Sequence, residues 1–422
     1  MLVIAGCQEN LAGGAACPSL CPDTLSLRDT VLVAREVVDT DATILGMPPL
    51  GTESQVLLAD YRRGAAHDQR IRTVGVLRFD SLQRAFADTD TTKPPKYFDR
   101  VDSAGLVLRL ITSDTVTDTA FVKDTVSFLV YDVDGPGSDF DTAAVRARFS
   151  GTPIASRKVP KDSVHGSIRI PLDSGFMAQH VRSGTRIRLG VAVESPQDVQ
   201  VRIGSNEGGN ASTLAYFGFV DTTKLSATVV ANTRSASGPT VSSLADYTLV
   251  LDGSPPPAPG VLAAGGIPSS RIFLRFDLPQ VLVDSATTVV RANLELHQVA
   301  NPLFPSSDSL SLLTRVVRAK PDLSDITKAS LLIADPSALG VRVPPITASP
   351  AVARVDTLPL VGLMLAWKAE GPTAAQRAIV LQSSAEGLDP RQYLIYSSSA
   401  SEDSLRPRLH ISYIPRSGFG LP

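Results

Sequence analysis

Four aspartates in one glycine-rich stretch are the residues of this sequence that could bind a metal. Asp132, Asp134, Asp139 and Asp141 lie within residues 132–141, directly after an apolar segment that alternates like a strand. Calcium takes several oxygen ligands from a chain that folds tightly around it, but the spacing does not fit an EF-hand, which needs a glutamate at its twelfth position. Asp and Gly also form ordinary turns, so the pattern favours a solvated turn, with a calcium site as the alternative.

A second candidate site is a cluster of basic residues in the loop between two expected strands. Arg62, Arg63, Arg70 and Arg72, together with His67, could bind an anionic polysaccharide or an acidic partner. Arginines that flank a strand are also ordinary surface residues, and this second interpretation is favoured.

The residue patterns of common enzyme classes are absent from the sequence. The five histidines are scattered, and no His-Glu-x-x-His motif indicates a zinc protease. Gly-x-Ser-x-Gly, a P-loop and a dinucleotide-binding fingerprint are also missing. The 40 basic and 42 acidic residues nearly balance, which gives no field that would favour nucleic acid. We therefore predict a non-catalytic protein with no certain cofactor and no nucleic-acid partner.

Cys7 is the candidate for a covalent lipid anchor. Residues 4–7, Ile-Ala-Gly-Cys, fit the lipobox of a bacterial lipoprotein signal. Only six residues precede Cys7, whereas a signal peptide has about 15 to 30, so a late start site or a trimmed sequence is expected. Residues 8–16 are small and polar, typical of a tether, and Cys17 and Cys21 favour a minor local disulfide. The alternative is an incidental cysteine in a disordered terminus.

Strands are the elements that must position these residues. Pro (31) and Gly (30) are frequent, Val, Ser and Thr recur, and long amphipathic helical patterns are nearly absent. Residues 74–82 and 271–279 share the sequence Leu-Arg-Phe-Asp, and each alternates with the period of a half-buried strand. Both copies therefore predict strands of the same kind in a duplicated architecture.

Further correspondences in the same order support a duplicated domain. Residues 247–252 resemble 55–60, and residues 358–366 resemble 170–178. We predict an all-β protein of two tandem antiparallel β-sandwich domains of jelly-roll character, each with one short helix, after a flexible tether. The predicted boundaries are 1–24 for the signal remnant and tether, 25–222 for the first sandwich, 223–415 for the second sandwich, and 416–422 for the C-terminal tail.

Trp367 could be a platform on which a sugar ring stacks. It lies in register with Leu360, Leu363 and Met364 at helical spacing, which favours one short helix packed on the core instead.

The C-terminal half resembles a known family. Residues 393–401 and 406–413, together with 273–278 and 290–296, resemble the DNRLRE type of domain over about residues 247–415, although the hexapeptide that names the family is absent. The resemblance implies a jelly-roll sandwich similar to carbohydrate-binding modules and found in bacterial surface and secreted proteins.

Two functions remain as hypotheses. The first is a lipid-anchored protein of the bacterial cell envelope, at the outer membrane or cell surface, that acts as a structural or binding module. The alternative is a carbohydrate-binding protein that recognises a polysaccharide through sandwich loops or a sandwich face. Its partners would be the membrane, through Cys7, and a polysaccharide or an envelope protein. Aromatic residues make up only 5% of the chain, which favours the first hypothesis.

Overall fold

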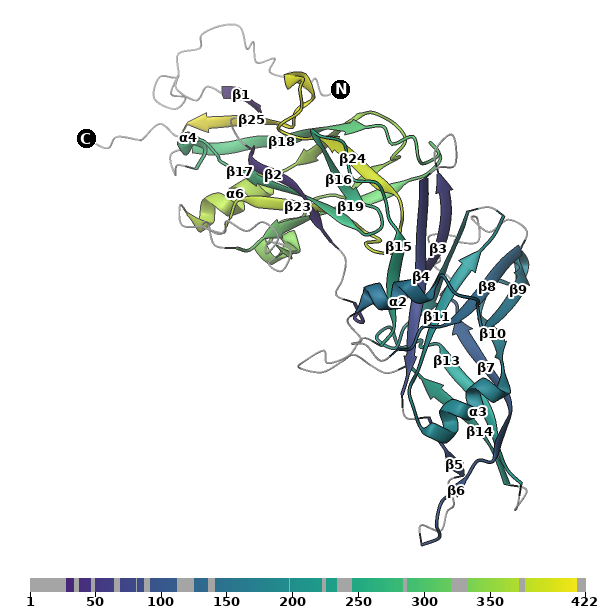
Figure 1. The fold of residues 1–422 in the computed structure, drawn as a ribbon. Helices are drawn as coiled ribbons and strands as arrows, with labels where there is room; N and C mark the ends of the chain where they lie inside the picture. Colours follow the sequence, from purple (N-terminus) through teal and green to yellow (C-terminus); the bar gives the residue numbers. More distant parts are fainter. Residues whose placement is uncertain are drawn as a thin grey trace, which may run out of the picture.

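The computed structural model describes most of the chain, and strands dominate it (Figure 1). The described ranges are 28–33, 38–46, 50–63, 69–80, 82–86, 92–111, 125–135, 141–196, 198–221, 225–233, 245–283, 287–319, 333–371 and 376–415. This confirms the predicted all-β class of antiparallel sandwiches. The predicted tether, the C-terminal tail, Cys7, Cys17, Cys21, His67 and Asp139 lie outside the described residues.

The first sandwich is built from residues 50–252. Its strands are β3 (Gln55–Arg63), β4 (Gln69–Phe79), β5 (Ala85–Phe86), β6 (Lys96–Tyr97), β7 (Arg100–Arg109), β8 (Thr125–Asp132), β9 (Ala155–Pro160), β10 (Ser167–Leu172), β11 (Ile187–Glu194), β12 (Val199–Gly204), β13 (Thr213–Val220), β14 (Leu225–Asn232) and β15 (Tyr247–Asp252). The larger sheet has the order β12-β3-β4-β11-β8-β9, with β15 paired to β4, and the smaller sheet has the order β10-β7-β13-β14. Apolar side chains between Val56 and Val229 fill the core between the two sheets.

The second sandwich takes strands from both ends of the chain. Its strands are β1 (Arg28–Val33), β2 (Val38–Leu45), β16 (Val261–Gly265), β17 (Ser270–Phe276), β18 (Thr287–Val299), β19 (Leu310–Val317), β20 (Ile333–Ala334), β21 (Ile346–Ala348), β22 (Val355–Pro359), β23 (Ala378–Ser383), β24 (Gln392–Tyr396) and β25 (Arg408–Pro415). The strand path β1-β25-β18-β24-β16-β17-β23-β19-β20 is continuous because β18 pairs with both β25 and β24. Its core lies among apolar residues between Leu262 and Ile411.

The same strand pairings occur in both sandwiches. β4 pairs with β11 and then β8, just as β17 pairs with β23 and then β19. The order β10-β7-β13-β14 in one corresponds to β22-β18-β25-β1 in the other. The two sheets of each sandwich also join at the same point, Leu110 with Ile203 and Gln298 with Ile395. This agreement is what a duplicated unit requires.

The strand pairings cross the predicted boundary between the domains. β1 pairs with β25 and β2 pairs with β17, so residues 28–45 belong to the second sandwich. β14 and β15 pair with β13 and β4, so residues 225–252 belong to the first. The prediction of 25–222 and 223–415 as separate packing units is therefore wrong, because the first sandwich is inserted into the second. We call residues 28–45 the leading arm and residues 225–252 the central arm.

The two arms fill equivalent positions, which corrects one sequence correspondence. Tyr247 pairs with Val76 in β4, and Ala42 pairs with Phe273 in β17, at the same place in the shared Leu-Arg-Phe-Asp strand. Residues 247–252 therefore correspond to the leading arm and not to residues 55–60. Strand alternation alone could not separate these assignments, because both segments have the same period.

An Asp-x-Thr sequence fixes each arm in its position. Thr43 Oγ1 accepts a hydrogen bond from Ala263 N at 3.0 Å, and Asp41 accepts one from Ser398 N. In the first sandwich Thr248 Oγ1 accepts from Leu57 N at 2.9 Å, and Asp246 accepts from Asn206 N at 2.8 Å. In each arm the threonine hydroxyl binds the backbone of a neighbouring strand, and the aspartate binds the backbone just after a second strand. These two bonds set the register of the arm.

The sandwiches differ from the prediction in their helices. One helix each was expected, but the described residues contain α2 (Thr142–Arg148) and α3 (Ser174–Ser183) in the first sandwich and α4 (Gln280–Val283) and α6 (Val361–Glu370) in the second. None of these helices has the length and apolar character needed to cross a membrane. The core position of Trp367 is confirmed, because it is 3% exposed and its ring lies 5.8 Å from that of Phe276.

The first Leu-Arg-Phe-Asp strand is buried on both faces instead of one. Residues 73–79 of β4 are all buried, including Arg78, which forms an ion pair with Asp80 at 3.0 Å. The outer face is covered because Val74 and Val76 pack with Val145 and Phe149 at helix α2 and with the central arm. The sequence period could not reveal this cover, since it comes from distant segments.

Candidate functional site

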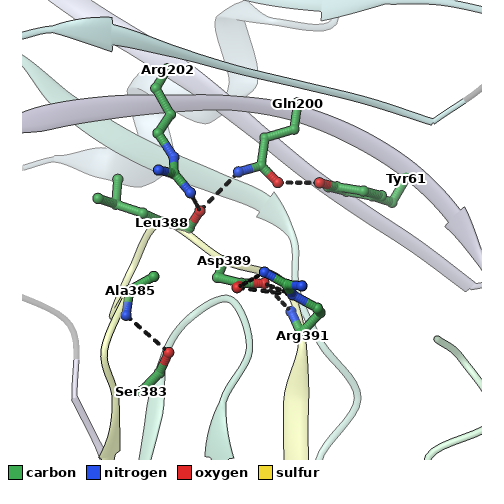
Figure 2. A network of polar contacts seen from close by, with 8 residues as sticks. All are labelled: Tyr61, Gln200, Arg202, Ser383, Ala385, Leu388, Asp389 and Arg391. Atoms are coloured by element: carbon green, nitrogen blue, oxygen red, sulfur yellow. Dashed lines mark hydrogen bonds and ion pairs between the residues drawn. The ribbon is translucent and has the colours of Figure 1, made fainter. Parts of the chain in front are cut away.

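The junction between the two sandwiches holds a polar network to which both sandwiches contribute. The carbonyl oxygen of Leu388 accepts hydrogen bonds from Gln200 Nε2 at 3.0 Å and from Arg202 Nη2 at 3.1 Å. Figure 2 shows both side chains reaching from β12 to this carbonyl. Tyr61 donates to Gln200 Oε1, which fixes the amide. One backbone carbonyl of the second sandwich is therefore bound by two side chains of the first.

The second sandwich holds its side of this network rigidly. Asp389, 4% exposed, accepts from Arg391 Nε at 2.8 and 2.9 Å and from Arg391 N at 2.9 Å (Figure 2). Ser383 Oγ accepts from Ala385 N at 3.2 Å in the same connection between β23 and β24. Charge-assisted bonds of this kind order a loop because both partners lose mobility together.

Apolar contacts accompany the polar ones. Ile267, in the turn between β16 and β17, is fully buried among Leu57, Tyr61 and Ile71 of β3 and β4. The strands β3 and β4, which flank the predicted basic loop, thus contact the turn between β16 and β17. The junction is consequently a packed interface that limits relative movement of the sandwiches.

A cavity of about 210 Å³ lies at this junction. Residues 52–55, Thr248 and residues 386–388 line it, so both sandwiches contribute. Typical ligand pockets have about 300 to 1,000 Å³. The cavity is thus smaller than a typical binding site for an organic ligand.

Two carboxylates line the cavity, and each already has partners. Glu53 accepts from Gly51 N at 2.7 Å and from Thr248 N at 3.4 Å, which connects the start of the first sandwich to its central arm. Glu386 accepts from Arg271 Nε and Nη2, both at 2.6 Å. Each carboxylate is therefore bound within its own sandwich, and their geometry provides no uncommitted acid-base pair.

Burial shifts the titration of two carboxyl groups beside the junction. Burial raises the pKa of Glu53 to about 7, although backbone N–H groups oppose the shift. Burial, followed by a hydrogen bond with Glu207, raises the pKa of Asp246 to about 7. Perturbed carboxyls occur at functional sites and also in structural networks. Here both groups cap backbone N–H groups, so the structural role is supported.

The predicted basic cluster consists largely of paired arginines. Arg70 forms two hydrogen bonds of 2.7 Å with Asp60, which is 4% exposed. Arg72 lies 3.6 Å from Glu194. Arg62 is exposed and lies in β3, as does Arg63. The structure places the four arginines on neighbouring strands, but two of them neutralise carboxylates of their own sandwich.

The predicted aspartate loop contains structural contacts. Asp132 Oδ1 accepts from Asp134 N at 3.1 Å, and Asp134 forms an ion pair with Arg186 at 3.0 Å. Asp141 is the N-cap of α2 and accepts from Ala144 N at 3.0 Å. Among the described residues no group of three or more His, Cys, Asp or Glu side chains could hold a metal. Calcium binding by the whole loop stays a prediction, since Asp139 is outside them.

Sequence reasoning missed the junction residues. Gln200, Arg202 and Glu53 belong to no motif, and the acceptor on Leu388 is a backbone atom that every residue has. No local signal in the sequence therefore identifies them.

Comparisons with known proteins do not assign the chain to a family. No family model and no curated protein matches it, so the resemblance to the DNRLRE domain stays a prediction. One solved structure that is similar in part is the infectious bursal disease virus VP2 subviral particle, at 10% identity over 96% of this chain and 80% of that chain. Its TM-score of 0.13 is too low to carry an argument.

Proposed function

We propose that this chain is a non-catalytic module of the bacterial cell envelope, lipid-anchored through Cys7, with a structural or binding role. The observation that carries the proposal is the position of the leading arm. β1 lies beside β25 in the second sandwich, and the first sandwich extends away from that end (Figure 1). An anchor before β1 would hold the second sandwich near the membrane and present the first sandwich outward.

The junction supports a structural role for this arrangement. The first sandwich is connected to the second at both of its ends, before β3 and after β15, and the Leu388 network adds a further attachment. Two connections and a packed interface suit a rigid spacer better than a flexible linker between domains.

The alternative, polysaccharide binding, is favoured by one feature of the outer end. Tyr97 is the one largely exposed aromatic residue among those described, at 56%, and the Arg84 guanidinium lies 5.5 Å from its ring centroid. An exposed ring beside a cation could stack on a sugar and pair with an acidic group. The other aromatic residues of the described chain are buried or half-buried, so this surface is small.

Metabolic labelling with a palmitate analogue tests the proposed function. The full gene with its own upstream region is expressed in a bacterium, beside the Cys7→Ser variant. We expect label and membrane fractionation for the wild type and loss of both for Cys7→Ser. An unlabelled wild type would contradict the lipid anchor. A glycan array with a Tyr97→Ala control tests the alternative, and Tyr97-dependent binding to one polysaccharide class would favour it over the structural module.

A further inference from the structure

The outer edge of β14 combines a length of 8 residues with a lack of charge. Residues 225–232 read Leu-Ser-Ala-Thr-Val-Val-Ala-Asn, with no Lys, Arg, Asp, Glu or Pro. β14 is the last strand of its sheet and pairs with β13 without a register shift from Leu225 to Asn232. In the described part of the chain no strand pairs with its other edge. A regular strand with an unpaired edge is a template for adding another strand.

The remaining strands at the ends of the sheet paths carry features that oppose such pairing. Lysine, arginine and proline on an edge strand, or a very short strand, prevent edge-to-edge association. These features are Arg28 and Asp29 in β1, Arg157, Lys158 and Pro160 in β9, Arg169 and Pro171 in β10, and the two-residue length of β20, whereas β12 is bridged at Ile203 by Leu110. β14 has neither kind of protection.

The duplicated architecture supplies an internal comparison for β14. β1 occupies the equivalent edge in the second sandwich, where Val31 pairs with His410 as Val230 pairs with Ala215. Val31 is 50% exposed and Val230 is 60% exposed. The two edges share geometry and an exposed valine, and the difference between them is the charged pair of Arg28 and Asp29 at the start of β1. The uncharged edge is therefore a property of the first sandwich alone.

We propose that β14 pairs antiparallel with β14 of a second copy of this chain. A two-fold axis brings the strand beside its own copy, so a charge near the axis would lie close to the same charge of the other copy, and β14 has none. The arrangement closes as a dimer and makes the smaller sheet of the first sandwich continuous across two copies. Val229, 7% exposed, lies on the face that packs on the core together with Ala227 and Ala231, so the apolar layer would continue across the joint. The dimer requires neither the lipid anchor nor a ligand.

Sedimentation velocity of the full chain over a range of micromolar concentrations tests the proposal with two matched variants. Val230→Lys adds a positive charge to the exposed face of β14 in both copies, close to the joint, and we expect the dimer dissociation constant to rise about tenfold. Val31→Lys places the same change on the equivalent β1 edge and should leave the dimer intact. Far-UV circular dichroism and thermal melting confirm that both variants fold.

Hydrogen exchange of the β14 amides provides a second measurement. Their protection should rise with concentration in the wild type and stay constant in Val230→Lys. A chain that is monomeric throughout overturns the proposal, as does a dimer that Val31→Lys weakens as much as Val230→Lys. Protection of the β14 amides by a different protein, without pairing between two copies of β14, also overturns the proposal.

Discussion

The fit between each arm and its sandwich can be tested by replacing the buried residue pair of one sandwich with the equivalent pair of the other. Tyr247 is fully buried against Val76, which is also fully buried, whereas the equivalent pair in the second sandwich is Ala42 and Phe273. One pair combines a large arm residue with a small strand residue, and the other reverses the sizes. If each arm occupied the other sandwich, Tyr247 would meet Phe273 and Ala42 would meet Val76, with overpacking in one and a void in the other.

Tyr247→Ala should lower the free energy of unfolding by about 3–5 kcal/mol, the cost of truncating a large buried aromatic side chain. Val76→Phe alone should cost about 1–3 kcal/mol, because it adds volume to a filled core. The double variant recreates the Ala and Phe pair of the second sandwich, so we expect it to be more stable than the sum of the single effects by about 1–3 kcal/mol.

Urea unfolding at 25 °C followed by far-UV circular dichroism measures all four proteins. Tyr247→Phe is the control, because it keeps the ring and removes a hydroxyl that has no hydrogen-bond partner in the described structure; it should cost less than about 1 kcal/mol. Additive effects of Tyr247→Ala and Val76→Phe would refute the reasoning, since they would mean that the two positions do not share one packing space.

Three further predictions concern charged groups. Glu53 and Asp246 have pKa values of about 7 in the folded protein and near 4 when unfolded. The contribution of these two groups to stability is therefore greatest below about pH 4 and falls as the pH rises through about 7, by about 4 kcal/mol for each group at most. Glu53→Gln should flatten part of this slope in urea unfolding. Arg70→Ala should lower the free energy of unfolding by about 1–3 kcal/mol, because it leaves the buried Asp60 without its cation. Arg62→Ala, at an exposed position, should change this free energy by less than about 0.5 kcal/mol. Equal losses would contradict the assignment. Because Arg186 neutralises Asp134, millimolar calcium should leave the melting temperature unchanged, and an increase that Asp132→Asn abolishes would instead establish a calcium loop.

The candidate sites show why residue type alone is a weak guide to function in this chain. The sequence places the arginines and the aspartates close together along the chain. Whether a clustered charge is available to a ligand depends on carboxylates and guanidinium groups that other strands bring to it, as Asp60 and Glu194 do for Arg70 and Arg72. That information is absent from any local window of sequence.

The sequence by itself determined the all-β class, the duplicated Leu-Arg-Phe-Asp strand and the buried position of Trp367. Each depends on a local period, and a period is set by the backbone geometry of strands and helices. The tertiary structure alone decided which sandwich each arm completes, because β1, β2, β14 and β15 have the same alternation and the Asp-x-Thr sequence suits both positions. The pairs Tyr247–Val76 and Ala42–Phe273 combine residues of opposite size from distant parts of the chain, and no local window of sequence shows which pair forms.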